Sequence, residues 1–496
     1  MGLASGITSV PNAAIVLALP TLHRELDAST TMLQWTVTGY LLTYSSLLIA
    51  AGRLADLLGR VRVLVAGTVL FMAASVAGAL ADSAVLLIAA MLLTGVGAAV
   101  LTPASLAIVT DAFRGDRRGM AVGVWGAATA LFSGIGPAIG GVLTGELDWR
   151  WILWLDVAIG AAILLGTRGA QESRIDPGAD SARFDVLGLL CSFGALGGVT
   201  IALNETPAEW SWGSPQTIAT LAAAAALLVA FVAAERRVRT PLIDLAMFAR
   251  RNLSGAATAL FAVDFALGAV LFFLPLYLQE LLGYDPFATG LLLLPSSAGM
   301  VLAMPLGGRL HDRVGPLPPV LAGLALSALA MLLLTGVDAG TRYADLWLPL
   351  ALLGLGIGAV LTPLNLAALG AVPQRRHAAV GAILTTVGGL GATFGVAASG
   401  ALFEALQVDR TVDQAREHGV RISSSVAQSL DGLLAGAPSA LDALRRFSRD
   451  DRDRLHDAVR DGFLSALSTT MALSLAVVAA GAIVAVALIR RRPAVD

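Results

Sequence analysis

Apolar segments of 16 to 27 residues recur along the whole chain, separated by short polar stretches that contain Arg, Asp, Gly and Pro. A helix needs about 20 predominantly apolar residues to cross a lipid bilayer. Only 14% of the 496 residues are charged, whereas about 25% are charged in a typical soluble protein. The sequence therefore predicts an all-α polytopic membrane protein.

Fourteen of these segments are long enough to be membrane-spanning helices. We place them at 2–20, 35–51, 63–80, 85–109, 120–143, 151–166, 186–203, 216–234, 253–277, 288–306, 319–334, 346–369, 379–402 and 463–489.

The arginines indicate how the chain is oriented. Loops after even-numbered segments, together with Arg490 to Arg492, contain 21 of the 33 arginines, and the short loops on the other side contain three. Cytoplasmic loops are enriched in Lys and Arg. We therefore expect both termini in the cytoplasm, in a bacterial cytoplasmic (inner) membrane. The segment 403–462 is then external, solvated and partly helical, with one helix beginning at Pro438.

Two motifs occur twice in the chain. The residues from Gly52 to Gly59 recur from Gly308 to Gly315, with Gly, Arg, Leu, Asp and Gly at matching positions. The stretch Gly95 to Pro103 recurs as Gly356 to Pro363. A duplication of this kind is typical of transporters whose two halves face each other around a site near the membrane midplane.

This duplication divides the chain into three parts. We expect a first six-helix half at 1–166 and a second at 252–496, which includes the external loop 403–462. Two inserted linker helices, with their cytoplasmic loops, occupy 167–251.

Two carboxylates lie within predicted spans. Asp264 is near the middle of the ninth span, and Asp156 is in the sixth, nearer its external end. A charge at the bilayer centre is costly, so its presence indicates a function. We interpret Asp264, and secondly Asp156, as candidates for proton or cation coupling. A structural hydrogen bond to a neighbouring helix and a contact with a cationic substrate are the alternatives for Asp264.

A substrate cavity in such a protein needs aromatic and neutral polar side chains that face the midplane. The candidates are Tyr40, Trp125, Phe272, Asn365 and Thr385.

Several classes of protein are excluded. We find no phosphate-binding glycine loop with Lys and no nucleophile with a paired base, so we expect no enzyme activity, ATP hydrolysis included. The single cysteine, Cys191, excludes disulfides, and the five histidines show no zinc-like pattern. We therefore expect no cofactor or metal. A net charge of −2 without a basic face argues against a nucleic-acid partner.

Four local signatures identify a family. The loop Gly52 to Arg62 resembles the cytoplasmic signature between spans two and three of the major facilitator superfamily. Gln34-Trp35 with Tyr40-Leu41-Leu42 resembles the start of the second span, Gly136 to Gly141 the antiporter motif of the fifth, and Trp149 to Ile152 the start of the sixth. Along nearly its whole length the chain resembles the fourteen-span drug:proton antiporter family of that superfamily.

The resemblance implies the major facilitator fold and a monomer surrounded by lipid. It also implies export of hydrophobic or amphipathic, drug- or antibiotic-like molecules in exchange for protons, by alternating access.

Physical roles can be given to two of these motifs. Asp56 can pair with Arg53 and Arg60 at helix ends flanked by Gly52 and Gly59, and can also face a helix N-terminus of the other half. Such contacts, with Asp312 in the repeat, would stabilise one of two conformations, although topology alone would also explain the arginines. In the fifth span, Gly136, Gly140 and Gly141 permit close helix approach and Pro137 bends the helix, although ordinary packing would also use small residues.

Three positions depart from the family pattern. Pro11 stands where the pattern has an acidic residue, Met91 stands where it has an arginine, and Gly388 stands at or next to a second arginine position. These differences leave three functions open. The first is proton-coupled drug efflux, which we favour, the second is transport of a lipid or secreted metabolite without protons, and the third is a non-transporting membrane sensor or scaffold.

Overall fold

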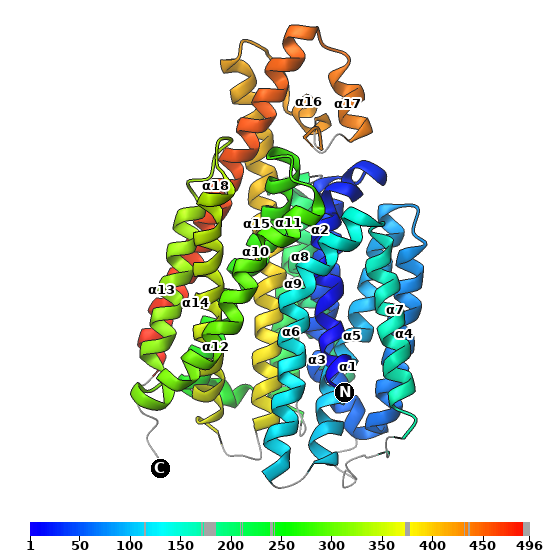
Figure 1. The fold of residues 1–496 in the computed structure, drawn as a ribbon, viewed down its shortest axis with the longest axis vertical. Helices are drawn as coiled ribbons and strands as arrows, with labels where there is room; N and C mark the ends of the chain where they lie inside the picture. The colour runs from blue at the N-terminus through cyan, green and yellow to red at the C-terminus, as the bar shows by residue number, and fades with distance from the viewer. Residues whose placement is uncertain are drawn as a thin grey trace.

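The computed structural model describes residues 1–113, 116–169, 172, 185–208, 210, 212–238, 242, 244–372, 377–430, 432–434 and 437–489. In this part of the chain every regular element is a helix. The long helices lie side by side (Figure 1): α2 (Val10–Glu25), α3 (Thr30–Leu58), α4 (Arg60–Ala79), α5 (Ala84–Ala112), α6 (Asp116–Glu146), α7 (Arg150–Gly166), α8 (Val186–Ala208), α9 (Pro215–Glu235), α10 (Arg251–Leu276), α12 (Leu294–Val314), α13 (Leu317–Leu334), α14 (Tyr343–Leu369), α15 (His377–Glu417) and α18 (Arg449–Leu488). The short ones are α1 (Gly2–Gly6), η1 (Ile7–Ser9), η2 (Leu245–Ala249), η3 (Tyr277–Leu281), α11 (Pro286–Leu292), α16 (Ser424–Ser429) and α17 (Pro438–Leu444).

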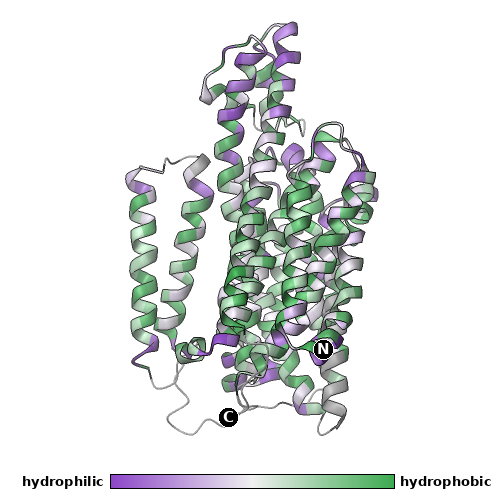
Figure 2. Cartoon of the chain, turned by 90° about the vertical axis from the view of Figure 1, so that its left-hand side faces the viewer, coloured by the Kyte–Doolittle hydropathy of each residue, from purple (hydrophilic) through white to green (hydrophobic). Residues whose placement is uncertain are grey.

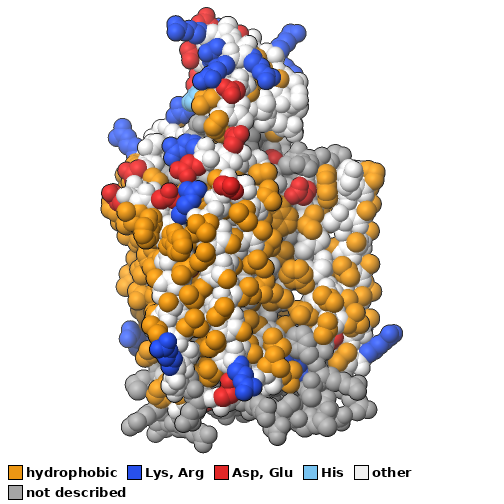
Figure 3. Space-filling model, turned by 90° about the vertical axis from the view of Figure 1, so that its right-hand side faces the viewer, with side chains coloured by type: hydrophobic (Ala, Val, Ile, Leu, Met, Phe, Trp, Pro, Cys, Tyr) orange, Lys and Arg blue, Asp and Glu red, His pale blue; other side chains and the backbone are white. Residues whose placement is uncertain are grey.

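The hydropathy of the helices matches a membrane environment. Twelve helical segments in the described residues are long and apolar enough to cross a membrane. Helices α6 and α7 lie at two further predicted spans, and α7 has 17 residues, so the count of fourteen stays a prediction. Hydrophobic residues predominate along the middle of the helices (Figure 2), and on the face drawn in Figure 3 apolar side chains form a broad band with charged side chains towards its two ends.

The helices pack in two groups. Helices α1–α7 pack mainly against one another and form the first group, and α10–α18 form the second group. Helix α5 packs against α3 and α4 in the first group, as α14 packs against α12 and α13 in the second. This shared pattern is what a duplicated sequence predicts. The groups meet where α3 packs on α15 and where α6 packs on α11 and α12. Helices α8 and α9 form a hairpin, and α8 packs against α3 and α15.

The segment between α15 and α18 forms a separate small structure, which we call the cap. The long helices α15 and α18 project beyond the other helices and carry α16 and α17 between them (Figure 1). The cap has its own apolar cluster, which includes Ala415, Leu430, Leu433, Ala440 and Leu455. We call this end of the molecule the cap end, and the opposite end, where the loop Gly52 to Arg62 lies, the loop end.

Candidate functional site

A cavity of about 250 Å³ lies between the two helix groups. Both groups contribute to its wall, since it is lined by the start of the chain, α3 and α6 on one side and by α10, α12 and α14 on the other. The lining residues are Thr8, Ser9, Asn12, Ala13, Tyr40, Leu41, Tyr44, Ser133, Pro137, Asp264, Leu267, Leu271, Ser296, Ser297, Met300, Gly354, Ile357 and Leu361.

The wall from the first group combines aromatic rings with polar groups. The rings of Tyr40 and Tyr44 are stacked, with centroids 6.0 Å apart and planes 6° from parallel. The Tyr40 hydroxyl donates to the Thr8 carbonyl, and the Tyr44 hydroxyl lies 3.3 Å from the Thr102 hydroxyl. The amide oxygen of Asn12 is buried and accepts no hydrogen bond from a described residue. This wall can therefore hold an apolar body and bind a donor group.

Asp264 of α10 is the one charged residue among the described residues that line the cavity. Within the described chain its carboxylate makes no hydrogen bond and no ion pair. A Cβ atom built on Gly388 of α15 would touch Asp264 Oδ2. Gly388, at or next to which the resemblance implies an arginine, therefore lies directly against this carboxylate, and as a glycine it offers the carboxylate no cationic partner.

Asp156 occupies a different place. It is fully buried in α7, near Ser75 of α4, and neither carboxylate oxygen accepts a hydrogen bond from a described residue. It does not line the cavity. Among the residues with described positions, no group of three or more His, Cys, Asp or Glu side chains could hold a metal ion.

The five predicted cavity residues are distributed over the molecule. Tyr40 lines the cavity. Trp125 Nε1 donates to Ser105 Oγ over 3.0 Å and joins α6 to α5. The other three lie elsewhere: Phe272 is buried edge-on against Phe273, Asn365 donates to the Leu361 carbonyl of its own helix, and Thr385 is exposed and donates to the Gly381 carbonyl.

None of the small polar residues of the wall was predicted from the sequence, among them Ser9, Ser133, Ser296 and Ser297. Serine is common on packed membrane helices, so the pattern did not distinguish these four.

The repeated loop motif forms ion pairs within the first group. Arg60 pairs with Asp56 over 2.8 Å and also with Asp111 at the end of α5. Gly59, with φ +109°, forms the turn from α3 to α4, a conformation that favours glycine. Arg53 is half-buried on α3, and the repeat residue Asp312 is exposed.

A different carboxylate occupies a helix N-terminus at this loop. Glu172 accepts hydrogen bonds from the backbone N–H groups of Val61, over 3.0 Å, and Arg62, over 3.1 Å, in the first turn of α4. The sequence suggested a helix N-terminus as one possible contact of Asp56, but Asp56 pairs with Arg60.

The glycines of α6 contact both helix groups. Cβ atoms built on Gly136 and Gly140 would meet Ala13 and Ala14 of α2. A Cβ atom on Gly141 would lie 3.1 Å from the Cα of Gly290 in α11, and it would also meet the Pro286 carbonyl. Small residues thus allow α6 to pack closely at the seam between the groups.

Hydrogen bonds join the two groups at the cap end. Gln279 Nε2 donates to the Leu17 carbonyl over 3.0 Å, and His23 Nδ1 lies 3.3 Å from Glu280 Oε1. The Thr31 hydroxyl donates to the carboxylate of Glu404 over 3.0 Å. These bonds hold the two groups together at the cap end.

Comparisons with known proteins agree on one family. A family model described as Major Facilitator Superfamily matches residues 1–396. The chain is 34% identical to the puromycin resistance protein pur8 of Streptomyces alboniger, over 88% of this chain and 86% of that protein. It is 35% identical to the multidrug resistance protein Stp of Mycobacterium tuberculosis (strain ATCC 25618 / H37Rv), over 78% and 72%.

A further relative and a solved structure extend this likeness. The tetracenomycin C resistance and export protein of Streptomyces glaucescens is 28% identical over 99% of this chain and 90% of that protein. The crystal structure of a bacterial homolog to the human lysosomal transporter Spinster covers 100% of this chain and 97% of its own, with a TM-score of 0.67 and 14% identity. At that identity the structure supports the fold alone.

Proposed function

Because this chain belongs to the Major Facilitator Superfamily, a family of membrane transporters and not of enzymes, we propose that it exports amphipathic, drug-like molecules in exchange for protons. The relatives that confer resistance to puromycin and other drugs support this substrate class. The observation that carries the proposal is the carboxylate of Asp264, which pairs with no described residue and lies in the wall of a cavity between the two helix groups.

The cavity can bind a proton and a substrate in turn. A carboxylate without a neighbouring cation binds either a proton or a positively charged group, and not both at once. The stacked rings of Tyr40 and Tyr44, with Leu267 and Leu271 opposite, hold the apolar part of a substrate. Competition between the two cations for Asp264 is the coupling step that antiport requires.

Alternating access follows from the seam between the groups. In the state described here the cap-end bonds of Gln279 and Glu280 are formed. Release toward the cap end requires these bonds to break and the groups to rotate about the contacts of α6, which is a rigid-body transition. The ion pairs of Arg60 with Asp56 and Asp111 fix the loop between α3 and α4 during that motion.

Exchange can be tested with purified protein in vesicles under an imposed pH gradient. We expect addition of a lipophilic cation to release protons from the protein, and the gradient to drive accumulation of that cation. A neutral amphiphile that moves without any proton signal, while the cation does not move, would replace this proposal with an uncoupled carrier of neutral lipids or metabolites.

The same proposal predicts an orientation with the cap outside. In a Cys191→Ser background, a cysteine at the exposed cap residue Arg421 should react with a membrane-impermeant maleimide added to intact cells. A cysteine at Arg313, exposed at the loop end, should react only after the cells are broken. The reverse pattern of labelling would contradict the proposed direction of transport.

A further inference from the structure

A π-helical turn lies where the second group reaches toward the first. Helix α10 passes into η3, which has π-helical geometry over Tyr277–Leu281 and follows Pro275. Single π turns are rare and occur often at functional sites. Here the turn directs Gln279 and Glu280 to the first group, where Gln279 bonds the Leu17 carbonyl and Glu280 pairs with His23.

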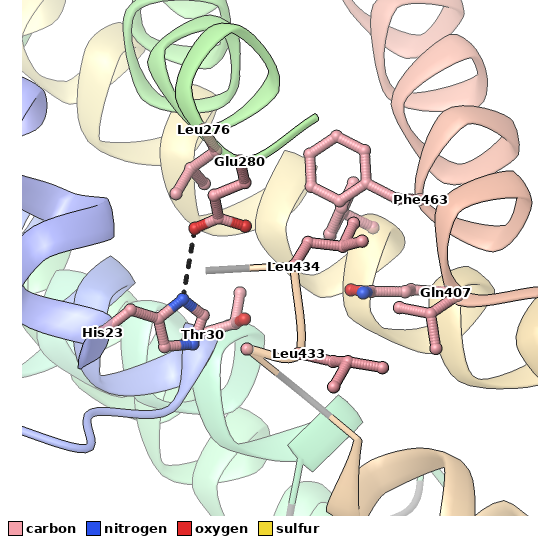
Figure 4. Close-up of a pocket in the computed structure, with 11 residues that line it drawn as sticks. His23, Thr30, Leu276, Glu280, Gln407, Leu433, Leu434 and Phe463 are labelled. Atoms are coloured by element: carbon pink, nitrogen blue, oxygen red, sulfur yellow. Dashed lines mark hydrogen bonds and ion pairs between the residues drawn. The ribbon is translucent and has the colours of Figure 1, made fainter. Parts of the chain in front are cut away.

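The pair of His23 and Glu280 is shielded from water. The two side chains are 4% and 5% exposed. Figure 4 shows them facing each other across the seam, with Leu433 and Leu434 of the cap on one side and Leu276 beside Glu280.

One backbone conformation allows the cap to lie so close. A Cβ atom built on Gly432, whose φ is +73°, would lie 2.8 Å from His23 Nε2. Glycine alone tolerates both this φ value and this contact without strain. The segment Gly432–Leu434 therefore covers the imidazole directly.

The cap spans both helix groups. The cap connects α15 and α18 of the second group. Its Ser439 hydroxyl nevertheless donates to Asp27 Oδ1 of the first group over 2.7 Å. The cap thus holds the seam together above the pair of His23 and Glu280.

We propose that His23 and Glu280 hold the cap end closed, and that protonation of His23 strengthens this closure. The inference rests on the proposed function, because it makes the cap end the side of release. A protonated imidazole forms a charge-assisted bond to a carboxylate, which is about twice as strong as the bond of a neutral imidazole. The covering cap keeps water from weakening that bond, and opening of the seam separates the two groups into solvent.

Uncharged side chains from four helices and the cap line the pocket beside the pair. The residues that line the pocket beside the pair are Thr30 from α3, Phe403 and Gln407 from α15, Leu276 from α10, Leu433 and Leu434 from the cap, and Val459 and Phe463 from α18. Two carboxylates of neighbouring segments, Glu404 and Asp27, accept from the hydroxyls of Thr31 and Ser439. Histidine changes charge between about pH 5 and about pH 8, so acid on the cap side should favour the closed state.

A distance measurement tests this without substrate. Spin labels are placed at Leu147, in the loop after α6, and at Gly340, in the loop before α14, in a Cys191→Ser background in lipid nanodiscs. On lowering the pH from about 8 to about 5.5, we expect the ratio of open to closed distances to fall about fivefold. His23→Gln and Glu280→Gln should each abolish that response.

A second histidine pair supplies the matched control. His418 of the cap lies 3.6 Å from Asp461 of α18, and the two side chains are 34% and 45% exposed, so His418→Gln should retain the full response. A wild-type ratio that does not change with pH, or a response that survives both His23→Gln and Glu280→Gln, would overturn the proposal. Since no substrate is present, failure of this test is distinguishable from failure of the proton-exchange test.

Discussion

Replacement of Asp264 by Asn is expected to reduce proton-driven export of a lipophilic cation at least about tenfold, with little loss of folded protein. The carboxylate makes no hydrogen bond or ion pair with a described residue, so the amide breaks no contact of the described structure. What the amide removes is the site at which proton and substrate compete. The measurement is accumulation of the cation in vesicles, with the proton signal recorded in parallel.

Asp156→Asn is the matched control for this prediction. It changes the other buried carboxylate, which lies outside the cavity in α7, so proton-driven export should stay near the wild-type rate. Equal losses in the two variants would indicate a general effect of removing buried acids. Wild-type export and an unchanged proton signal in Asp264→Asn would rule out the coupling role of Asp264.

Replacement of Gly141 by Leu is expected to lower export about tenfold or more by a different route, because it prevents the cap end from closing. The first atom of the new side chain would already lie 3.1 Å from the Cα of Gly290, with the Pro286 carbonyl next to it. Backbone atoms of α11 cannot move aside alone, so α6 and α11 must separate. The spin-label pair at Leu147 and Gly340 should then report a longer distance at every pH.

Gly166→Leu is the control for Gly141→Leu, since a Cβ built at this end of α7 would meet no described residue beyond its own turn of helix within 4 Å. It adds the same bulk and should leave both export and the distance unchanged. If Gly141→Leu exports at the wild-type rate, close packing of α6 on α11 is not needed for the transport cycle.

The sequence predicted where each helix begins and ends far better than it predicted which face of the helix points to the cavity. The predicted span 253–277, for example, corresponds to α10 at Arg251–Leu276. Spans that are apolar on all sides have no marked polar face, and consecutive residues point about 100° apart at 3.6 residues per turn. The predicted site residues therefore divide: Asp264 and Tyr40 do line the cavity, whereas Asn365 and Thr385 donate hydrogen bonds to carbonyls of their own helices.

Contacts between the two halves could not be predicted at all. His23 and Glu280 are 257 residues apart, and the sequence contains no sign of the π turn that brings them together. From the sequence, the five histidines showed only the absence of a zinc-like pattern. It likewise missed Glu172 at the N-terminus of α4, because a lone acidic residue in a connecting segment has no distinctive spacing.

The unbroken helices α15 and α18 link the second group rigidly to the cap. With 41 and 40 residues, each is about 60 Å long at 1.5 Å per residue. If such a helix pivots by about 10° about its end opposite the cap, its cap end moves by about 10 Å. Small rotations of the second group are therefore amplified outside the bilayer, where an antibody fragment bound across α17 and the neighbouring first-group loops could arrest the whole cycle mechanically.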